Sequence, residues 1–222
     1  MCVALTHNFL NSLSKKHSRV LAVCPHPDDE FGCAGSIYRF IQEGAYVKYV
    51  ALSKCEISIP EPFPKNILEV ECRRCMEILG IREESVAILD FPVRDFPNHR
   101  QDILEMFVKL NRDYNPELVL IPSSYDTHQD HATVFQEGFR AFKHCSVLGY
   151  ELPQNLISFN NSAFVRLSKR CLEKKIEALS QYVSQATKRY ASAEFIRALA
   201  HVRGAQCNTD YAEAYEVIRL IL

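Results

Sequence analysis

Short apolar runs of strand length alternate along this chain with segments of helical period, and this alternation constrains the fold most. The helical segments carry apolar residues three and four positions apart, and Gly44 and Gly80 follow two of them, where glycine commonly ends a helix. Alternating strands and helices are typical of a parallel sheet with helices on both faces. The sequence therefore predicts an α/β fold with a doubly wound, mostly parallel sheet. The predicted strands are residues 20–24, 47–52, 86–91 and 118–121, and the predicted helices between them are residues 35–42, 67–79 and 102–110.

The last third of the chain is predicted to be mainly helical. After residues 146–151 and a strand-like segment at 163–167, the pattern indicates helices at 169–182, 186–201 and 211–221. Leu172, Ile176 and Leu179 form a stripe at helical spacing, which is typical of core packing. With 222 residues and 47% hydrophobic content, the chain is long enough for one domain with a sizeable core and short for two. We expect one domain over residues 1–222.

Charge and cysteine content narrow the class of partner and the compartment. A formal charge of −1 gives no long-range field that would recruit nucleic acid, so we expect a small-molecule partner. Nine scattered cysteines fit a reducing cytoplasm, and Cys72 and Cys75 are better explained as ordinary helix cysteines than as half of a zinc knuckle. Residues 1–13 have neither a basic start nor the roughly 20 apolar residues that span a bilayer, so we expect a cytoplasmic protein without integral membrane association. Nothing in the sequence specifically supports a homo-oligomer, which stays an open alternative.

Two clusters of histidine and acidic residues directly follow predicted strands. The carboxyl ends of parallel strands meet at one edge of a doubly wound sheet, so the two clusters should converge there. A histidine and a carboxylate three positions apart can bind one divalent ion from a single turn. The first cluster contains His26, Asp28, Asp29 and Glu30, and the second contains His128, Asp130 and His131.

These residue types predict a metal site with an open coordination position. His26, Asp29 and His131 would supply two imidazoles and one carboxylate, a ligand set suited to zinc hydrolysis. Asp28 would be the general base, taking a proton from water whose pKa the ion lowers to about 7, and its rival role is that of a second carboxylate ligand. His128 would stabilise the developing oxyanion or protonate the leaving amine.

The remaining acids of the two clusters have supporting roles in this interpretation. Asp130 would orient an imidazole through its free ring nitrogen. Glu30 is expected to hydrogen-bond loop amides or to cap the following helix rather than to react. In a simpler interpretation His26 caps a turn and the acids cap a helix, but capping explains one acid and not three with a histidine.

The two clusters together resemble the motifs of the LmbE-like, or PIG-L, family of zinc-dependent N-acetylglucosaminyl de-N-acetylases. Residues 26–30 are similar to its first motif, His-Pro-Asp-Asp-Glu, and residues 128–131 to its second, His-x-Asp-His. The resemblance implies a Rossmann-like fold and hydrolysis of the N-acetyl group of an amino sugar or its conjugate, with release of acetate and a free amine. It also implies Zn²⁺, with another divalent ion such as Fe²⁺ as the alternative, bound by His26, Asp29 and His131.

One departure from the family leaves the binding of substrate open. Many members carry an arginine three residues before the glutamate that matches Glu71, and this chain has Leu68 there. We take Arg94, Asp95 and Tyr125 as candidate substrate contacts, because they lie on predicted loops at the same edge of the sheet. Asp95 would hydrogen-bond sugar hydroxyls, and Tyr125 would polarise the acetyl oxygen.

Two other functions stay open at this point. Two histidines and one carboxylate also form the facial triad of non-haem iron oxygenases, although the Asp28–Asp29 pair and the parallel-sheet pattern count against that class. A non-catalytic sugar-binding member of the fold would keep the same residues for binding alone.

Overall fold

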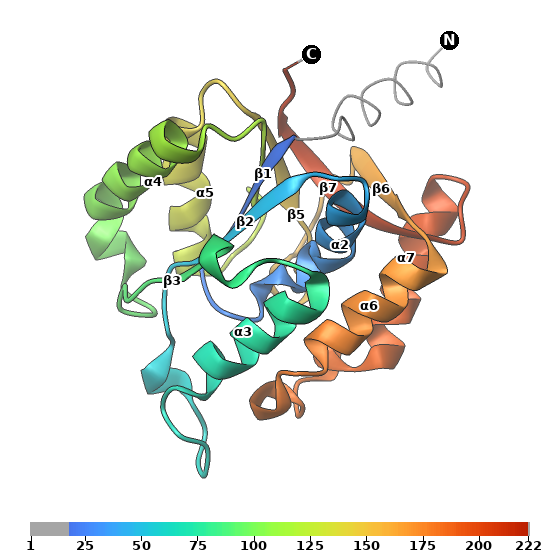
Figure 1. The fold of residues 1–222 in the computed structure, drawn as a ribbon, viewed down its shortest axis with the longest axis horizontal. Helices are drawn as coiled ribbons and strands as arrows, with labels where there is room; N and C mark the ends of the chain where they lie inside the picture. The colour runs from blue at the N-terminus through green and yellow to red at the C-terminus, as the bar shows by residue number, and fades with distance from the viewer. Residues whose placement is uncertain (1–17, 222) are drawn as a thin grey trace.

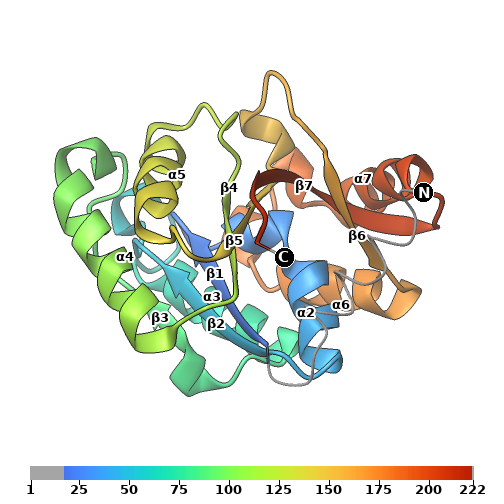
Figure 2. The same cartoon turned by 90° about the horizontal axis from the view of Figure 1, so that it is seen from above.

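The computed structural model describes residues 18–221 and shows a sheet of seven strands in the order β3-β2-β1-β4-β5-β7-β6, with helices on both of its faces (Figures 1 and 2). Five neighbouring strands run parallel, and β7 is antiparallel to the strands on either side of it. The predicted doubly wound, mostly parallel fold is confirmed. The strands are β1 (Arg19–Cys24), β2 (Tyr46–Ala51), β3 (Val86–Ile88), β4 (Leu118–Pro122), β5 (Ser146–Tyr150), β6 (Ala163–Leu167) and β7 (Tyr211–Arg219).

Helices cover the two faces of the sheet, and the sheet separates the core into two clusters. Successive residues of β1 point to opposite faces, so Val20 and Ala22 belong to one cluster and Leu21 and Val23 to the other. Strands that are buried on both faces have continuous apolar sequences, which is why strands such as β1 and β4 could be predicted. The first cluster includes residues of α2 (Ala34–Gln42), α3 (Ile67–Leu79), α6 (Lys169–Leu179) and α7 (Ala193–Gln206), and the second includes residues of α4 (Arg100–Tyr114) and α5 (Gln129–Ala141).

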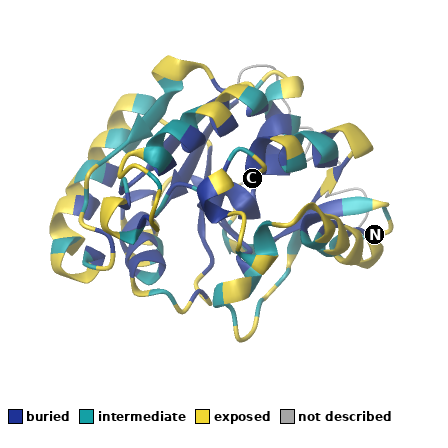
Figure 3. Cartoon of the chain, turned by 90° about the horizontal axis from the view of Figure 1, so that it is seen from below, coloured by how far each residue is buried: buried dark blue, intermediate teal, exposed yellow. Residues whose placement is uncertain are grey.

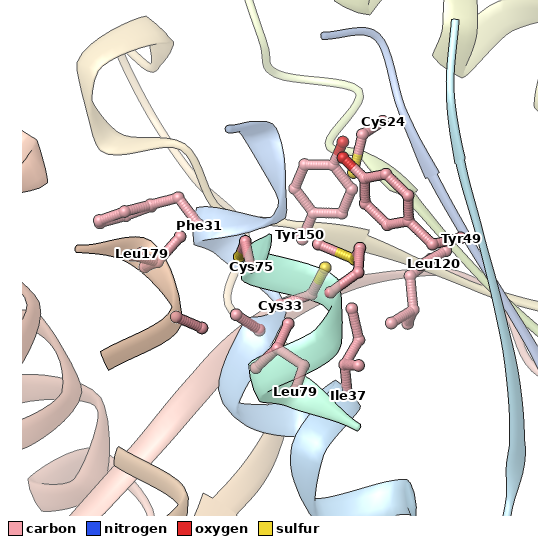
Figure 4. Packing of buried hydrophobic residues seen from close by; sticks show 14 of the residues in the cluster. Cys24, Phe31, Cys33, Ile37, Tyr49, Cys75, Leu79, Leu120, Tyr150 and Leu179 are labelled. Carbon is pink, nitrogen blue, oxygen red and sulfur yellow. The ribbon is translucent and has the colours of Figure 1, made fainter. Parts of the chain in front are cut away.

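The first cluster is rich in aromatic and sulfur-containing side chains. Figure 4 shows Tyr49 and Tyr150 beside Cys24, with Cys33 and Cys75 near them. The stripe of α6 predicted to pack in the core does so, because Leu172 and Leu179 are buried and Ile176 packs against the same cluster. The eight cysteines within residues 18–221 are all free, and Cys72 and Cys75 are buried cysteines of α3.

The helix predicted at 211–221 is wrong, because this segment forms strand β7. The strand lies between β5 and β6, and Ala212 to Tyr215 are all buried. Burial of both faces removes the alternation that marks a half-exposed strand, and alanine and glutamate favour a helix locally. Pairing with two neighbouring strands overrides that local preference.

Other differences concern helix bounds and one helix that sequence patterns did not reveal. Helix α5 begins inside the second motif and was not predicted. The helix expected at 169–182 ends at Leu179, and the helix expected at 186–201 begins only at Ala193, where the side chain of Ser192 accepts a hydrogen bond from the backbone N–H of Phe195. Two 3₁₀ turns, Val183–Gln185 and Arg189–Ala191, fill the interval.

Within residues 18–221, none of the helices combines the length and the apolar character that a membrane-spanning helix needs. Residues 1–13, on which the prediction about export rests, lie outside the described residues.

Candidate metal centre

The two predicted clusters meet at the carboxyl ends of β1 and β4, which are neighbours in the sheet. The chain leaves β1 toward β2 on one side and leaves β4 toward β5 on the other, so the two loops diverge at a topological switch point. Figure 3 shows the molecule from this side, with buried segments at its centre and exposed loops around them. The location is the one where open α/β sheets bind ligands.

Three atoms that can bind a cation form a nearly equilateral triangle at this point. The distance from Asp29 Oδ2 to His26 Nδ1 is 3.2 Å, and the distance from the same oxygen to His131 Nε2 is also 3.2 Å. His26 Nδ1 and His131 Nε2 are 3.1 Å apart. For ligand bonds of about 2.1 Å, ligand atoms lie about 3.4 Å apart in a tetrahedral site and about 3.0 Å apart in an octahedral one. We call these atoms the metal triangle, since they fit one divalent ion.

An acidic side chain holds the far nitrogen of each imidazole. His26 Nε2 is 2.9 Å from Asp130 Oδ2, and His131 Nδ1 is 2.8 Å from Asp126 Oδ2. A neutral imidazole that donates to these carboxylates carries no proton on its other nitrogen, so both free lone pairs face Asp29. Three electron-rich atoms in contact repel one another unless a cation or a proton lies between them. The donor set therefore suits a metal ion.

The pKa shifts at the triangle have the same electrostatic cause. Burial lowers the pKa of His131, but the carboxylates of Asp29 and Asp126 outweigh burial and raise that pKa to about 10. Burial raises the pKa of Asp29, but His131 and His26 hold it well below its usual range. Without a metal, a proton on an imidazole supplies the positive charge that the acids require, and a bound cation would displace that proton.

Asp28 lies next to the triangle in a conformation that is unusual for a residue other than glycine. Its φ angle is 91°, in the left-handed region, and its side chain is 17% exposed. Lys188 Nζ donates a hydrogen bond to Asp28 Oδ2 over 3.1 Å. Burial raises the pKa of Asp28 more than the charge of Lys188 lowers it, so the pKa lies above its usual value. A carboxylate with a raised pKa is a stronger base than an ordinary aspartate.

His128 is the N-cap residue of α5, and its ring lies against the other two histidines. Its Nδ1 accepts a hydrogen bond of 3.2 Å from the backbone N–H of Asp130, so the neutral ring carries its proton on Nε2. Burial and the neighbouring His131 and His26 lower the pKa of His128, which favours this neutral, donating form. One ring nitrogen of each histidine lies within 4.8 Å of the others, so His128 is an alternative ligand. We favour Asp29 as the third ligand, because its oxygen is closer to both imidazoles and carries negative charge.

The Glu30 carboxylate contacts side chains of other segments and does not cap α2, so the expectation that it caps the following helix is wrong. Its carboxylate is fully buried and accepts hydrogen bonds from Tyr182 Oη at 2.5 Å, Tyr49 Oη at 2.9 Å and Cys75 Sγ at 3.1 Å. Burial outweighs the hydrogen bonds from Tyr182 and Cys75 and raises the pKa of Glu30 to about 7. Glu213 of β7 instead binds the first amides of α2, at Gly35 and Ser36.

The three candidate substrate contacts lie at the edge of the site. Arg94 donates through its backbone N–H to Asp130 Oδ2 at 2.7 Å, and its exposed guanidinium contacts Ser58 Oγ at 3.2 Å. Asp95 is engaged locally, with Asn98 Nδ2 at 2.6 Å and His99 Nε2 at 3.2 Å. Tyr125 is 41% exposed, whereas the next residue, Asp126, is buried. Their roles in binding substrate stay predictions.

Sequence reasoning missed two residues that touch the centre. Asp126 supports His131 and also accepts from the backbone N–H of His128 at 2.9 Å. Its position two residues before His128, directly after a strand, was a usable signal. Lys188 has no such signal, because 160 positions separate it from Asp28 in the chain.

Sequence comparisons place relatives of this chain among deacetylases. The profile of the PIG-L family, described as GlcNAc-PI de-N-acetylase, matches residues 21–142, which is more than half of the chain. The uncharacterized deacetylase YaiS of Escherichia coli is 27% identical over 180 residues, covering 79% of this chain and 96% of YaiS. A probable N-acetyl-α-D-glucosaminyl L-malate deacetylase 2 of Bacillus anthracis is 28% identical over 201 residues, covering 78% of this chain and 84% of that protein.

Solved structures share the fold. The N,N′-diacetylchitobiose deacetylase from Pyrococcus horikoshii superposes with a TM-score of 0.76 at 18% identity, over 98% of this chain and 93% of that one. The 4-carboxy-2-hydroxymuconate hydratase GalB of Pseudomonas putida superposes with a TM-score of 0.77 at 20% identity, over 92% and 98%. The fold therefore carries more than one chemistry, and the function has to be argued from the site.

Proposed function

This chain belongs to the PIG-L, or LmbE-like, family, and on that premise we propose that it is a metal-dependent hydrolase that removes the N-acetyl group from an N-acetylated amino sugar or its conjugate. The observation that carries the proposal is the metal triangle of His26, Asp29 and His131, whose three distances lie between 3.1 and 3.2 Å. Zn²⁺ or another divalent ion such as Fe²⁺ fits this ligand set. The products would be acetate and a free amine.

A divalent ion at the triangle would lower the pKa of water and polarise the acetyl carbonyl. Asp28 accepts a proton from the attacking water as the new C–O bond forms. His128, which carries its ring proton on Nε2, donates a hydrogen bond to the oxygen on which negative charge develops. The C–N bond then breaks, and the proton that Asp28 took from water passes to the leaving nitrogen, because a neutral His128 would become an imidazolate if it gave up its proton.

Asp126 and Asp130 keep the two ligand imidazoles in the required tautomer and orientation. Each carboxylate lies within 2.9 Å of the ring nitrogen that faces away from the triangle. Backbone N–H groups fix Asp130 in turn, at 2.7 Å from Arg94 and 3.3 Å from Phe96. The triangle is thus pre-arranged by groups that do not themselves need to contact substrate.

The relatives support an amino-sugar substrate and leave its conjugate open. One relative is named for a malate conjugate of N-acetylglucosamine and one structural neighbour for diacetylchitobiose. Position 68, where many family members have an arginine, is a buried core leucine in this chain, so no arginine there can contact the substrate. We propose that other groups at the mouth of the site hold the sugar, with Arg94, Asp95 and Tyr125 as candidates, and that one domain carries the whole site.

The direct test is acetate release from N-acetylglucosamine, N,N′-diacetylchitobiose and N-acetylglucosaminyl L-malate by protein purified without chelator, with the metal content measured on the same sample. The proposal predicts chelator-sensitive acetate release by protein holding about one metal per chain. Oxygen-dependent turnover of these compounds with iron, or sugar binding by metal-replete protein without acetate release, would contradict it.

A further inference from the structure

A segment near the end of the chain, Tyr182 to Tyr190, lies across the first motif. Tyr182 Oη donates to Glu30, and Ser184 donates to Glu71 of α3 through both its backbone N–H, at 2.9 Å, and its hydroxyl, at 2.6 Å. The ring of Tyr190 packs edge-on against Phe31, with centroids 6.0 Å apart. The segment lies outside residues 21–142, so the family match assigns none of its residues a role.

Within this segment Lys188 contacts Asp28, the proposed base. Among residues 18–221, Lys188 supplies the one side-chain hydrogen bond to the carboxylate of Asp28, from Nζ to Oδ2 at 3.1 Å. Asp28 needs such a partner, because its neighbour Asp29 carries the same charge and its own backbone is in the left-handed region at φ 91°. Without Lys188 no described side chain would fix the direction in which this carboxylate points.

Lys188 is itself held in place. Its Nζ lies 5.5 Å from the centroid of the Tyr190 ring, a cation–π distance, and its backbone N–H donates to Gln185 O at 3.0 Å. Its side chain nevertheless stays 40% exposed, so it lies at the mouth of the site and not in the core. An anchored cation at that place can orient a carboxylate at little cost to folding.

We propose that Lys188 is a positioning residue for Asp28, an inference that rests on the proposed function. Its ammonium holds Oδ2 and leaves Oδ1 free to accept the proton of the attacking water. Lys188 transfers no proton in this scheme and binds no metal. Its loss should therefore slow the reaction without changing how much metal or substrate binds.

The test compares three variants of the full chain loaded with Zn²⁺. Lys188→Met keeps the length of the side chain without its charge, Lys188→Arg restores the charge, and Lys174→Met removes a half-buried lysine of α6 that pairs with Glu177. We expect Lys188→Met to lower kcat by about 10- to 100-fold with KM and bound metal unchanged, Lys188→Arg to recover part of the loss, and Lys174→Met to match the wild type. A raised KM with normal kcat, or wild-type kcat in Lys188→Met, overturns the proposal.

A second measurement is independent of turnover. In metal-free protein, the urea midpoints of Lys188→Met, Asp28→Asn and the double variant form a double-mutant cycle. If Lys188 and Asp28 interact, their substitutions should change stability non-additively. The substitutions Lys174→Met and Asp28→Asn should change stability additively. Additive effects of Lys188→Met and Asp28→Asn would overturn the proposed contact between these residues, whether or not any compound tested releases acetate. A failure to release acetate, by contrast, would count only against the proposed function.

Discussion

At the scale of single residues, the centre concentrates negative charge that a bound cation or a protonated imidazole has to balance. Asp29, Asp126 and Asp130 share the imidazoles of His26 and His131, while Asp28 pairs with Lys188, the one lysine or arginine of the described residues whose side chain hydrogen-bonds any of these acids. Each imidazole of the triangle lies between two carboxylates. The histidines are therefore held as ligands from behind, by acids that the metal would not touch.

Asp126→Asn should lower the affinity for Zn²⁺ by about 10- to 100-fold, because the amide no longer favours the tautomer of His131 that presents Nε2 to the metal. Competition with a chelating dye measures this affinity directly. Asp95→Asn is the matched control, since Asp95 contacts Asn98 and His99 at the surface. Equal affinities for the wild type and Asp126→Asn would mean that His131 needs no support from Asp126.

Mutagenesis should distinguish the general base from the metal ligands, because only loss of a ligand should remove the metal. Asp28→Ala should keep about one metal per chain and lose about 10²- to 10⁴-fold in kcat, the usual contribution of a general base. His131→Ala should lose the metal itself, because one corner of the triangle disappears. Metal analysis and acetate release on the same samples give both answers. Full turnover in the first variant, or full metal content in the second, would remove the corresponding assignment.

At the scale of elements, strand β7 joins the C-terminal segment to the helix that follows the first motif. Glu213 of β7 accepts hydrogen bonds from the backbone N–H groups of Gly35 and Ser36, at 2.9 and 2.7 Å, and forms a salt bridge of 2.7 Å with buried Lys175 of α6. The carboxylate thus satisfies the N-terminus of α2 and neutralises a buried ammonium. A helix at 211–221 would have left both groups without this partner.

Glu213→Gln should destabilise the protein by about 3–5 kcal/mol, because it leaves Lys175 buried without its counter-charge. Urea unfolding at neutral pH measures the change. Glu173→Gln removes an exposed partner of Arg197 and should shift the midpoint little. If Glu213→Gln behaved like this control, the buried pair would not contribute to stability.

The Glu30 carboxyl, which joins four parts of the fold, makes the stability of the protein depend on pH. It follows β1 and contacts Tyr49 of β2, Cys75 of α3 and Tyr182 after α6. Its pKa is about 7 in the folded protein against 4.5 for a free glutamate, so the folded state binds the proton more tightly than the unfolded state. This contribution is fully present below about pH 4.5 and is lost as the pH rises through 7, by at most about 3 kcal/mol.

Glu30→Gln, which mimics the protonated acid, should remove this contribution to the pH dependence. Stability measured by urea unfolding at pH 5, 6, 7 and 8 should fall less steeply in the variant than in the wild type. The metal-free protein is the suitable sample, because metal binding adds its own pH dependence. Parallel curves for the two proteins would show that Glu30 does not titrate in this range.

At the scale of the whole molecule, the part of the fold that could be predicted is the part built from local pattern. Strands β1, β2 and β4 are apolar runs, and both ligand clusters directly follow such runs, so the convergence of His26, Asp29 and His131 followed from topology alone. Strand β7 could not be predicted in this way, because its residues favour a helix until β5 and β6 pair with them. Lys188 could not be predicted either, since its contact with Asp28 depends on how the 3₁₀ turns after α6 pack onto the first motif.

We propose that one divalent ion at the metal triangle makes this chain a de-N-acetylase. We would first titrate metal-stripped protein with Zn²⁺ and follow two quantities together. These are the bound metal per chain and the rate of acetate release from the test compound that is hydrolysed fastest. We expect the rate to rise in proportion to bound metal and to stop rising at about one ion per chain. Acetate release that is already complete without metal, or no acetate release at full occupancy, would contradict it.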